Sequence, residues 1–341
     1  MSNPTIATVA GLASVSIATV SRYLNEPDKV KPATRERIQK AIQKLQYSPN
    51  TLAQSFRRGR TNVIMVVMPS VGDPFLADVL SGIREEIGTR YSLLIAEADL
   101  KHRTYEEVGA MFVSRQVDGL ILLATLPPFG TKLDDISRDQ RLPVVVGCES
   151  ISHELEGLPS VHIDNFQAAF EATSYLTDLG HERIAFFSGP TDSLLTQDRE
   201  RGYREAMAAR NLPVKEDWVS STTLTIGGGA LAAKRLLSLA ERPSAIFCAN
   251  DEMALGVLDT LRTRKIRVPA EMSLIGFDDS RYAAVANPPL STVAQPAAEI
   301  GRRVALRILR EIEGSSEPAP LDDLLQHRLV IRQSTGRAPT R

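Results

Sequence analysis

Small hydroxyl side chains and one arginine are spaced through the stretch SIATVSRYLN, residues 16–25. Arg22 is long enough to hold a guanine edge with two hydrogen bonds. Ile17 and Ala18 donate no side-chain hydrogen bond, so they could contact only thymine methyl groups or follow DNA shape. On a helix, this stretch has the chemistry of a recognition element that enters the major groove of DNA.

A second group of chemically active residues comes directly after apolar runs that favour strands. Ligands of parallel α/β folds gather at the carboxyl ends of strands, so we expect these side chains to line one ligand site. Carboxylates, an amide and an aromatic ring would hydrogen-bond to and stack on a hydroxylated ring. The candidates on this ground are Asp73, Phe75, Cys148, Glu149, Asn250, Asp251, Asp278 and Asp279.

Three of these residues also have ordinary structural explanations. Asp251 is equally typical of a helix N-cap, Asn250 of a turn and Asp279 of a solvated loop. Both interpretations stay open for each of them.

The first sixty residues divide by hydrophobic periodicity into three short helices. Thr5 and Ser16 are good caps for the first two, and Pro32 suits the first position of the third. The residues expected to face inward are Ile6, Val9, Ala10, Ala13, Val20, Leu24, Ile38, Ala41, Ile42 and Leu45. Three helices with a tight turn between the first two predict a helix-turn-helix.

From Val63 onward, short apolar runs alternate with amphipathic stretches. The runs predict buried parallel strands at VIMVVM, SLLIAEA, GLILLA, PVVVG, RIAFFSG, AIFCAN and SLIGFDD. The stretches predict helices over 75–88, 103–115, 166–179, 198–210 and 251–264. This alternation predicts a doubly wound α/β fold, and its length predicts two such lobes.

Charge is divided unevenly along a chain of 341 residues whose formal net charge is only -1. Residues 1–60 carry ten Lys and Arg and three acidic residues, whereas the remainder is acidic. This asymmetry predicts a basic nucleic-acid module on an acidic body. Cys148 and Cys248 lie far apart among apolar residues, which favours reduced core thiols, and the lack of a long apolar run favours a cytoplasmic protein.

Motifs for catalysis are weak. GGGALA, residues 227–232, fits a dinucleotide-binding pattern with Asp251 as the ribose carboxylate, but the polar SSTTLTI before it is not a buried strand. The alternative is a flexible loop that caps a helix. His181 follows a helix-ending LG and is more typical of a surface or capping group than of a base. We therefore expect no enzyme, cofactor or metal site.

Residues 5–62 resemble the DNA-binding headpiece of the lactose/galactose-repressor (LacI/GalR) family, through VSIATVSRYLN, TRERI and YSPNTLAQ. The resemblance implies base reading by Ile17, Ala18 and Arg22. It implies phosphate contacts by Thr5, Ser16, Thr19, Ser21, Asn25, Tyr47 and Asn50.

The match also has a hinge helix and two departures from the family pattern. Phe56, beside Arg57, matches the residue that wedges into the minor groove, although a lone aromatic there could instead pack on the core. Thr8 stands where an acidic residue is usual. Ser14 replaces a turn glycine, which costs about 1 kcal/mol if its φ is positive.

The rest of the chain resembles the effector domain of the same family, which is similar to periplasmic sugar-binding proteins. DPFLADVLSGI, LGHERIAFFSGP and AIFCANDEMALG carry the resemblance. Cys148 stands where Asp or Asn is common, with Glu149 as its possible substitute, and Leu224 where an aromatic is frequent. The implied effector contacts are Phe75, Cys148, Arg199, Leu224, Asn250, Asp278 and Gln295.

The expected organisation is an all-α helix-turn-helix headpiece followed by two doubly wound α/β lobes. The boundaries are 1–49 for the headpiece, 50–60 for the hinge helix and linker, and 61–341 for the effector-binding and dimerisation domain. The first lobe takes 61–161 and 291–322, and the second takes 162–290 and 323–341.

The expected function is a transcriptional regulator, as a repressor, that binds pseudo-palindromic operator DNA as a homodimer. Its effector would be a small metabolite, a nucleoside or a sugar, and cytidine-repressor-like members favour a nucleoside. The alternative is a small-molecule sensor or transport-type protein that does not act on DNA.

Overall fold

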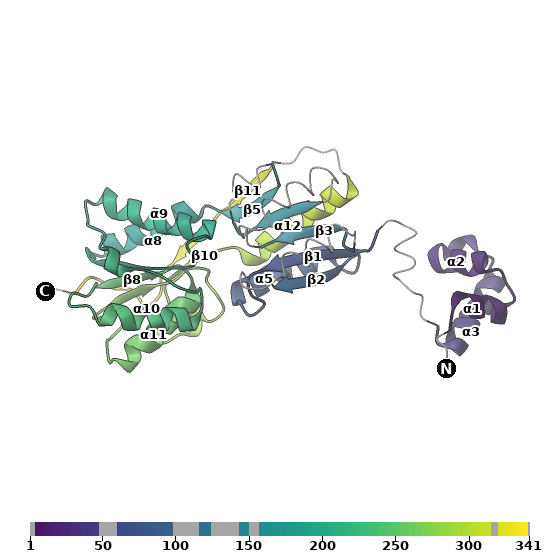
Figure 1. Cartoon of the computed structure of the whole chain (residues 1–341), viewed down its shortest axis with the longest axis horizontal. Coiled ribbons are helices and arrows are strands. Elements are labelled where there is room, and N and C mark those ends of the chain that lie inside the picture. Colours follow the sequence, from purple (N-terminus) through teal and green to yellow (C-terminus); the bar gives the residue numbers. More distant parts are fainter. Residues whose placement is uncertain are drawn as a thin grey trace. The chain divides into compact units, whose positions relative to one another are not determined.

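The computed structural model describes residues 4–47, 60–97, 116–123, 143–149, 157–314 and 320–339. The chain forms two compact units, Met1–Thr61 and Asn62–Arg341 (Figure 1). The predicted contacts at Asn50, Phe56 and Arg57 and the helix predicted over 103–115 lie outside the described residues.

The first unit is a helix-turn-helix followed by a third helix. Its elements are α1 (Ile6–Ala13), α2 (Ile17–Asn25), the 3-10 turn η1 (Pro27–Lys29) and α3 (Pro32–Leu45). The α1 and α2 axes are bent by 106°, within the range of this motif. Buried Val9, Ala10, Ala13, Val20, Ile38 and Ala41 form its core.

Local hydrogen bonds define where these helices begin. Thr5 and Thr8 form a reciprocal capping box, with the Thr5 N–H donating to Thr8 Oγ1 at 2.8 Å. The Thr8 hydroxyl therefore takes the place of the usual acidic side chain. Ser16 caps α2 as predicted. Ser14 has φ +52°, so this position does require the left-handed backbone that favours glycine.

The second unit, Asn62–Arg341, is called the core domain, or the core, below and consists of two lobes. Its first lobe has a six-stranded parallel sheet in the order β11-β5-β4-β3-β1-β2. Helices α5 (Pro74–Ile87) and α12 (Ala297–Glu313) pack against each other, and α12 contacts the middle of the sheet. The strands are β1 (Val63–Met68), β2 (Ser92–Glu97), β3 (Gly119–Leu122), β4 (Val144–Gly147), β5 (Ser160–Ile163) and β11 (Asp322–Leu325).

The prediction of a buried strand at SLLIAEA is wrong for β2. Leu94 is 36% exposed and Ile95 is 43% exposed, whereas β1 beside it is almost completely buried. The reason is position, because β2 is the last strand of the sheet and pairs with β1 alone.

The second lobe has a four-stranded parallel sheet in the order β7-β6-β8-β9. Helices α8 and α9 pack as one pair and α10 and α11 as another, and the pairs cover opposite faces of the sheet (Figure 1). The strands are β6 (Ile184–Ser188), β7 (Val219–Ser221), β8 (Ala245–Cys248) and β9 (Ser273–Ile275). The helices are α8 (Asn165–Asp178), α9 (Leu194–Ala209), α10 (Ile226–Leu237) and α11 (Asp251–Thr263), with short turns η3 (Glu216–Trp218) and η4 (Ala283–Val285).

The glycines of GGGALA lie inside α10, so the flexible-loop interpretation is wrong. A Cβ on Gly229 would lie 2.0 Å from the Met253 carbonyl oxygen, and one on Gly256 would lie 1.9 Å from that of Ile226. These two glycines therefore let α10 and α11 cross with their backbones nearly touching.

The two lobes are joined at three places along the chain. β5 leads into α8, β9 leads through β10 (Thr292–Ala294) to α12, and β11 leads into β12 (Arg328–Val330). β10 and β12 pair as an antiparallel ribbon. Because β11 belongs to the first sheet, that lobe ends between Leu325 and Arg328, a few residues beyond the expected 322.

His181 is 1% exposed, which contradicts its assignment to the surface. Its ring nitrogens hydrogen-bond to Ser244 Oγ at 2.8 Å and Ser273 Oγ at 3.0 Å, and Nε2 also reaches the Gly336 carbonyl. Burial lowers its pKa, which favours the neutral ring.

Cys148 and Cys248 are buried free thiols, as predicted. Among the described helices, none alone is long and apolar enough to cross a membrane, although α1 and α2 together reach the limit by composition.

Candidate DNA-binding surface and effector site

The outer face of α2 is built by its helical period. Residues 17, 18, 21 and 22 fall on one side, while Val20 is fully buried on the other. Ile17 is 49% exposed, and Ala18 and Arg22 are also exposed. Within the described residues no hydrogen bond or ion pair holds the Arg22 guanidinium, so it is available to a partner.

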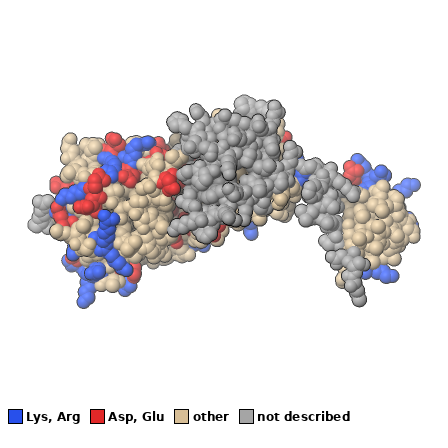
Figure 2. All heavy atoms as spheres, in the orientation of Figure 1, with Lys and Arg blue, Asp and Glu red and all other residues tan. Residues whose placement is uncertain are grey.

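The predicted phosphate-contact residues fall into several environments. Thr5, Ser16 and Thr19 are at least partly exposed at helix starts, and the Ser16 and Thr19 hydroxyls are 2.8 Å apart. Helix N-termini favour anions because of their free N–H groups. Ser21 is half-buried, and Tyr47 packs against the headpiece core. Lys and Arg side chains lie on the visible headpiece surface (Figure 2).

Arg199 is the centre of the second candidate site. It lies on α9 and is 3% exposed. Its Nε donates to Asn165 Oδ1 at 2.9 Å, and a terminal nitrogen donates to the Ala249 carbonyl at 2.6 Å. The nitrogen that bonds to Ala249 lies 3.9 Å from an Asp278 carboxylate oxygen. Burial lowers the pKa of Arg199, and the negative charge of Asp278 is the largest effect opposing it.

Asp278 and Gln295 are directly paired. Gln295 Nε2 donates to Asp278 Oδ1 at 2.7 Å, and both side chains are more than nine-tenths buried. Burial raises the pKa of Asp278 well above its ordinary value, although nearby Arg199 acts in the opposite direction. Gln295 Oε1 is buried and has no hydrogen-bond partner among the described residues. A buried acceptor of this kind favours a ligand or water that donates a hydrogen bond.

Three further predicted residues lie near this cluster. Asp73 caps α5, accepting the Phe75 N–H at 2.8 Å, and burial raises its pKa. Glu149 is 2% exposed and accepts from Ser193 Oγ at 3.4 Å. Cys148 has φ +72°, and burial followed by the charge of Glu149 raises its thiol pKa. Asp73, Glu149 and Asp278 thus bring three carboxylates near the guanidinium of Arg199, which favours a ligand rich in hydroxyl or amino donors.

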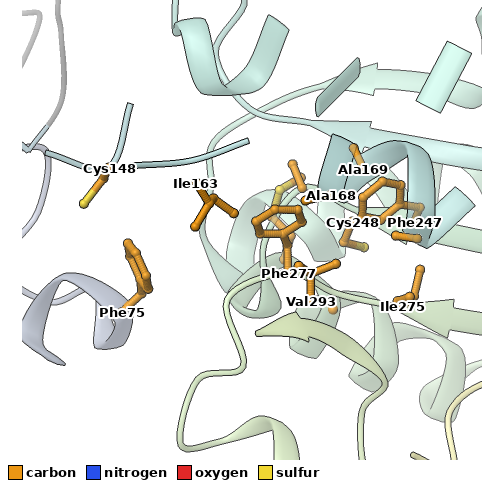
Figure 3. Packing of buried hydrophobic residues seen from close by; sticks show 14 of the residues in the cluster. Phe75, Cys148, Ile163, Ala168, Ala169, Phe247, Cys248, Ile275, Phe277 and Val293 are labelled. Carbon is orange, nitrogen blue, oxygen red and sulfur yellow. The ribbon is translucent and has the colours of Figure 1, made fainter. Parts of the chain in front are cut away.

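The predicted residues Phe75, Leu224 and Asn250 come from both lobes: Phe75 lies in the first lobe, and Leu224 and Asn250 lie in the second. The Phe75 ring and the Cys148 side chain come from first-lobe elements, and Phe277 belongs to the second lobe (Figure 3). Asn250 is the N-cap of α11, through Oδ1 and the Met253 N–H, so the N-cap is Asn250 rather than Asp251. Its Nδ2 donates to the carbonyl of Leu224, a partly buried residue packed against the core.

Three further buried residues of the second lobe, Asn165, Thr196 and Phe277, have no predicted role from the sequence. Asn165 and Thr196 are buried, and each has a polar atom, Nδ2 and Oγ1 respectively, without a partner. Phe277 lies under the guanidinium of Arg199. Asn165 follows the end of β5 by two residues, which is the kind of strand-end position where the sequence predicts ligand contacts. Thr196 lies inside a helix and gave no such signal.

A cavity of about 470 Å³ opens beside the cluster. The first lobe contributes Phe75, Asp78 and the start of α12 to its lining. The second lobe contributes Asp278, Asp279 and Ser280. The predicted residues Phe75, Asp278 and Gln295 therefore share one space between the lobes, large enough for a small metabolite.

Known proteins match both units. Residues 5–50 match the family described as "Bacterial regulatory proteins, lacI family", and residues 173–335 match "Periplasmic binding protein-like domain". The HTH-type transcriptional repressor CytR of Escherichia coli K12 is 36% identical over 98% of this chain and 97% of its own length. The chain belongs to the lacI family. As a lacI-family protein it is a DNA-binding transcriptional regulator with an effector-binding core.

Other lacI-family relatives also match this chain over nearly its full length. Catabolite control protein A of Priestia megaterium is 34% identical over 98% of this chain and 99% of its own. The solved complex of the regulator CelR with cellobiose has a TM-score of 0.73 and 33% identity, covering 97% of this chain and 99% of that one. An operator-bound lac repressor dimer shares the fold, with a TM-score of 0.84, 23% identity and coverage of 98% and 100%. These named relatives are regulators rather than enzymes.

Proposed function

We propose that this regulator binds a nucleoside between its two lobes, and that binding changes the affinity of a homodimer for a pseudo-palindromic operator. The observation that carries the proposal is the buried Arg199, Asp278 and Gln295 cluster with its unsatisfied Gln295 oxygen. The sensor that does not act on DNA is set aside, since the headpiece match covers residues 5–50.

On the DNA side, Arg22 reads a guanine while Ile17 and Ala18 follow thymine methyl groups or groove shape. Thr5, Ser16, Thr19, Ser21, Asn25, Tyr47 and Asn50 contact phosphates, which position the headpiece without specifying sequence. With one hydrogen-bonding base reader per recognition helix, much of the specificity comes from DNA deformation where Phe56 and Arg57 meet the minor groove.

On the effector side, the chemistry fits a ribose. Vicinal hydroxyls donate to carboxylates such as Asp278 and accept from a guanidinium such as Arg199. Asp73, Glu149, Asn250 and Gln295 supply the surrounding polar groups, and the Phe75 ring, Cys148 and Leu224 supply apolar surface for a base. The excess of carboxylates disfavours a phosphorylated effector, because its charge would be repelled.

A disaccharide is the second candidate, because the relative solved with cellobiose is 33% identical. A sugar presents the same hydroxyl donors but no planar base. The two candidates therefore differ in what lies against Phe75.

The bound effector changes operator affinity by changing how far the two lobes close on each other. A ligand that contacts both lobes changes their closure only by its difference in affinity for the two conformations. That same free energy appears as the change in operator affinity, because the coupling between the two sites is reciprocal.

The test is a thermal-shift and calorimetric titration of the full chain with cytidine, uridine, adenosine, cellobiose and cytosine. We expect cytidine to bind and cytosine to fail, since cytosine lacks the ribose. Binding of cellobiose with no nucleoside binding would replace the nucleoside by a sugar. Operator affinity is then measured by fluorescence anisotropy with and without the bound compound, and an unchanged affinity would overturn the regulatory step.

A further inference from the structure

The carboxylate of Asp251 is fully buried and lies outside the proposed ligand-contact group. It is the first residue of α11, and its N–H donates to the Phe277 carbonyl at 2.8 Å. Each carboxylate oxygen accepts a separate hydrogen bond. Oδ1 accepts from Thr292 Oγ1 at 2.7 Å, and Oδ2 accepts from the Ser280 N–H at 2.7 Å.

One of those bonds ends on the turn that carries Asp278, and the other ends on Thr292 of β10. Asp278 has φ +113° and Asp279 has φ +56°, conformations that are strained for residues with a Cβ. Such a turn persists only when its surroundings hold it. The Ser280 N–H is held by Asp251 directly. The Asp279 N–H donates at 3.4 Å to Thr292 Oγ1, the hydroxyl that itself donates to Asp251.

The space around this carboxylate is closed. A Cβ on Gly276 would lie 2.2 Å from Asp251 Oδ1, so a side chain at 276 would displace the carboxylate. Both oxygens of the buried Asp251 carboxylate are hydrogen-bonded, which favours one arrangement of the groups that they hold.

The same turn is attached to the ribbon that joins the lobes. Asp278 N–H donates to the Val293 carbonyl of β10 at 2.8 Å. Asp279 accepts from Arg332 at 2.6 Å, just beyond β12, and Arg332 also donates to the Leu290 carbonyl at 2.8 Å. The turn is therefore in contact with Arg199 and Gln295, with β10 and with Arg332 beyond β12.

We propose that Asp251 is a positioning residue, which holds the Asp278–Ser280 turn against β10 so that Asp278 faces the effector. This inference rests on the proposed function, because it concerns how an effector contact is presented. Asp251 acts through Thr292 and Ser280 and does not touch the ligand.

A carboxylate suits this role better than an amide because both oxygens accept. In Asp251→Asn one of the two donors, the Thr292 hydroxyl or the Ser280 N–H, loses its partner while the side-chain volume is kept. Other charged or titratable groups near Asp251 are Asp278, Asp279 and Cys248, with Arg199 and Arg332 beyond them.

The first experiment measures cytidine affinity of the full chain by calorimetry. Asp251→Asn should weaken binding about tenfold, the effect of one lost hydrogen bond to a charged acceptor. The control is Asp259→Asn, at an exposed position of the same helix, which should leave affinity unchanged. Thr292→Val should weaken binding like Asp251→Asn, whereas Thr292→Ser, which keeps the hydroxyl, should restore it.

A double-mutant comparison separates positioning from general damage. If Asp251 acts through Asp278, then Asp251→Asn should add nothing further once Asp278→Asn is present. Additive losses would overturn the proposal, because they would mean that Asp251 acts on binding by another route.

A measurement without ligand completes the test. Amide hydrogen exchange at Asp279 and Ser280 should speed up in Asp251→Asn and stay unchanged in Asp259→Asn. Unchanged exchange would overturn the positioning role. If the unmodified chain binds no cytidine, the nucleoside assignment fails, while the exchange result still decides whether Asp251 holds the turn.

Discussion

The guanidinium carbon of Arg199 lies 3.6 Å from the centroid of the Phe277 ring. The planar group is thus stacked on an aromatic face while its edge donates to Asn165 and to the Ala249 carbonyl. Stacking and edge bonding together fix the direction in which Arg199 faces Asp278. Only a delocalised, planar cation can make all of these contacts at once.

Arg199→Lys should therefore abolish effector binding, lowering affinity about a hundredfold or more, because an ammonium cannot replace both the stacking and the fork of donors. Calorimetry on the full chain measures this. Arg201→Lys is the matched control, since Arg201 lies on the same helix, also over an aromatic ring, but is 63% exposed. Equal effects of the two substitutions would remove Arg199 from the site.

Arg22→Ala should cost about 1–3 kcal/mol of operator binding and relax the preference at one base pair. Within the described headpiece the exposed guanidinium has no hydrogen bond or ion pair that its loss would remove. Anisotropy titrations with operator variants and with unrelated DNA give both quantities. An equal loss on unrelated DNA would mean that Arg22 contacts phosphates instead.

Gly256→Ala should destabilise the core by about 1–3 kcal/mol, because the new Cβ would meet the Ile226 carbonyl oxygen and push α11 away from α10. Urea unfolding at constant pH measures the change. Gly227→Ala on α10 is the control, since its nearest neighbour would be 3.9 Å away, and it should be neutral or stabilising by about 0.5–1 kcal/mol.

The stability of the core should fall between about pH 4 and pH 7 through Asp251. Burial raises the pKa of Asp251 from 3.8 to about 7, although Thr292 and Ser280 hydrogen-bond to the ionised form. The folded state then binds more protons than the unfolded state in this window, so the free energy of unfolding decreases as pH rises, by roughly 4 kcal/mol at most.

Urea unfolding of the natural chain and of Asp251→Asn at pH 5 and pH 8 tests this sign. Between pH 5 and pH 8 the free energy of unfolding of the natural chain should fall relative to that of Asp251→Asn, because the natural carboxylate is ionised at pH 8. Subtracting the variant removes the parallel contribution of Asp278, whose pKa burial also raises. A difference that is the same at both pH values would contradict the prediction.

Much of this protein is determined by local sequence. Thr5 and Ser16 start their helices with their own side chains, and the apolar runs from VIMVVM to SLIGF form strands where they were predicted. Helix caps and hydrophobic periodicity act over a few residues, so a single sequence carries them. The strand-end rule also selects Asp73, Glu149 and Asp278, and the structure brings these three carboxyl groups near Arg199.

Other features exist only because distant segments meet. The sequence around Gly229 does not indicate that α11 packs against this glycine. The exposure of β2 likewise depends on its position at the edge of the sheet. The sequence around Asp251 is typical of a helix cap, yet its carboxylate accepts hydrogen bonds from Ser280 and Thr292, 29 and 41 residues away. Burial and long-range hydrogen bonds are set by packing, which is why only the tertiary structure shows that this helix-start aspartate holds Ser280 and Thr292.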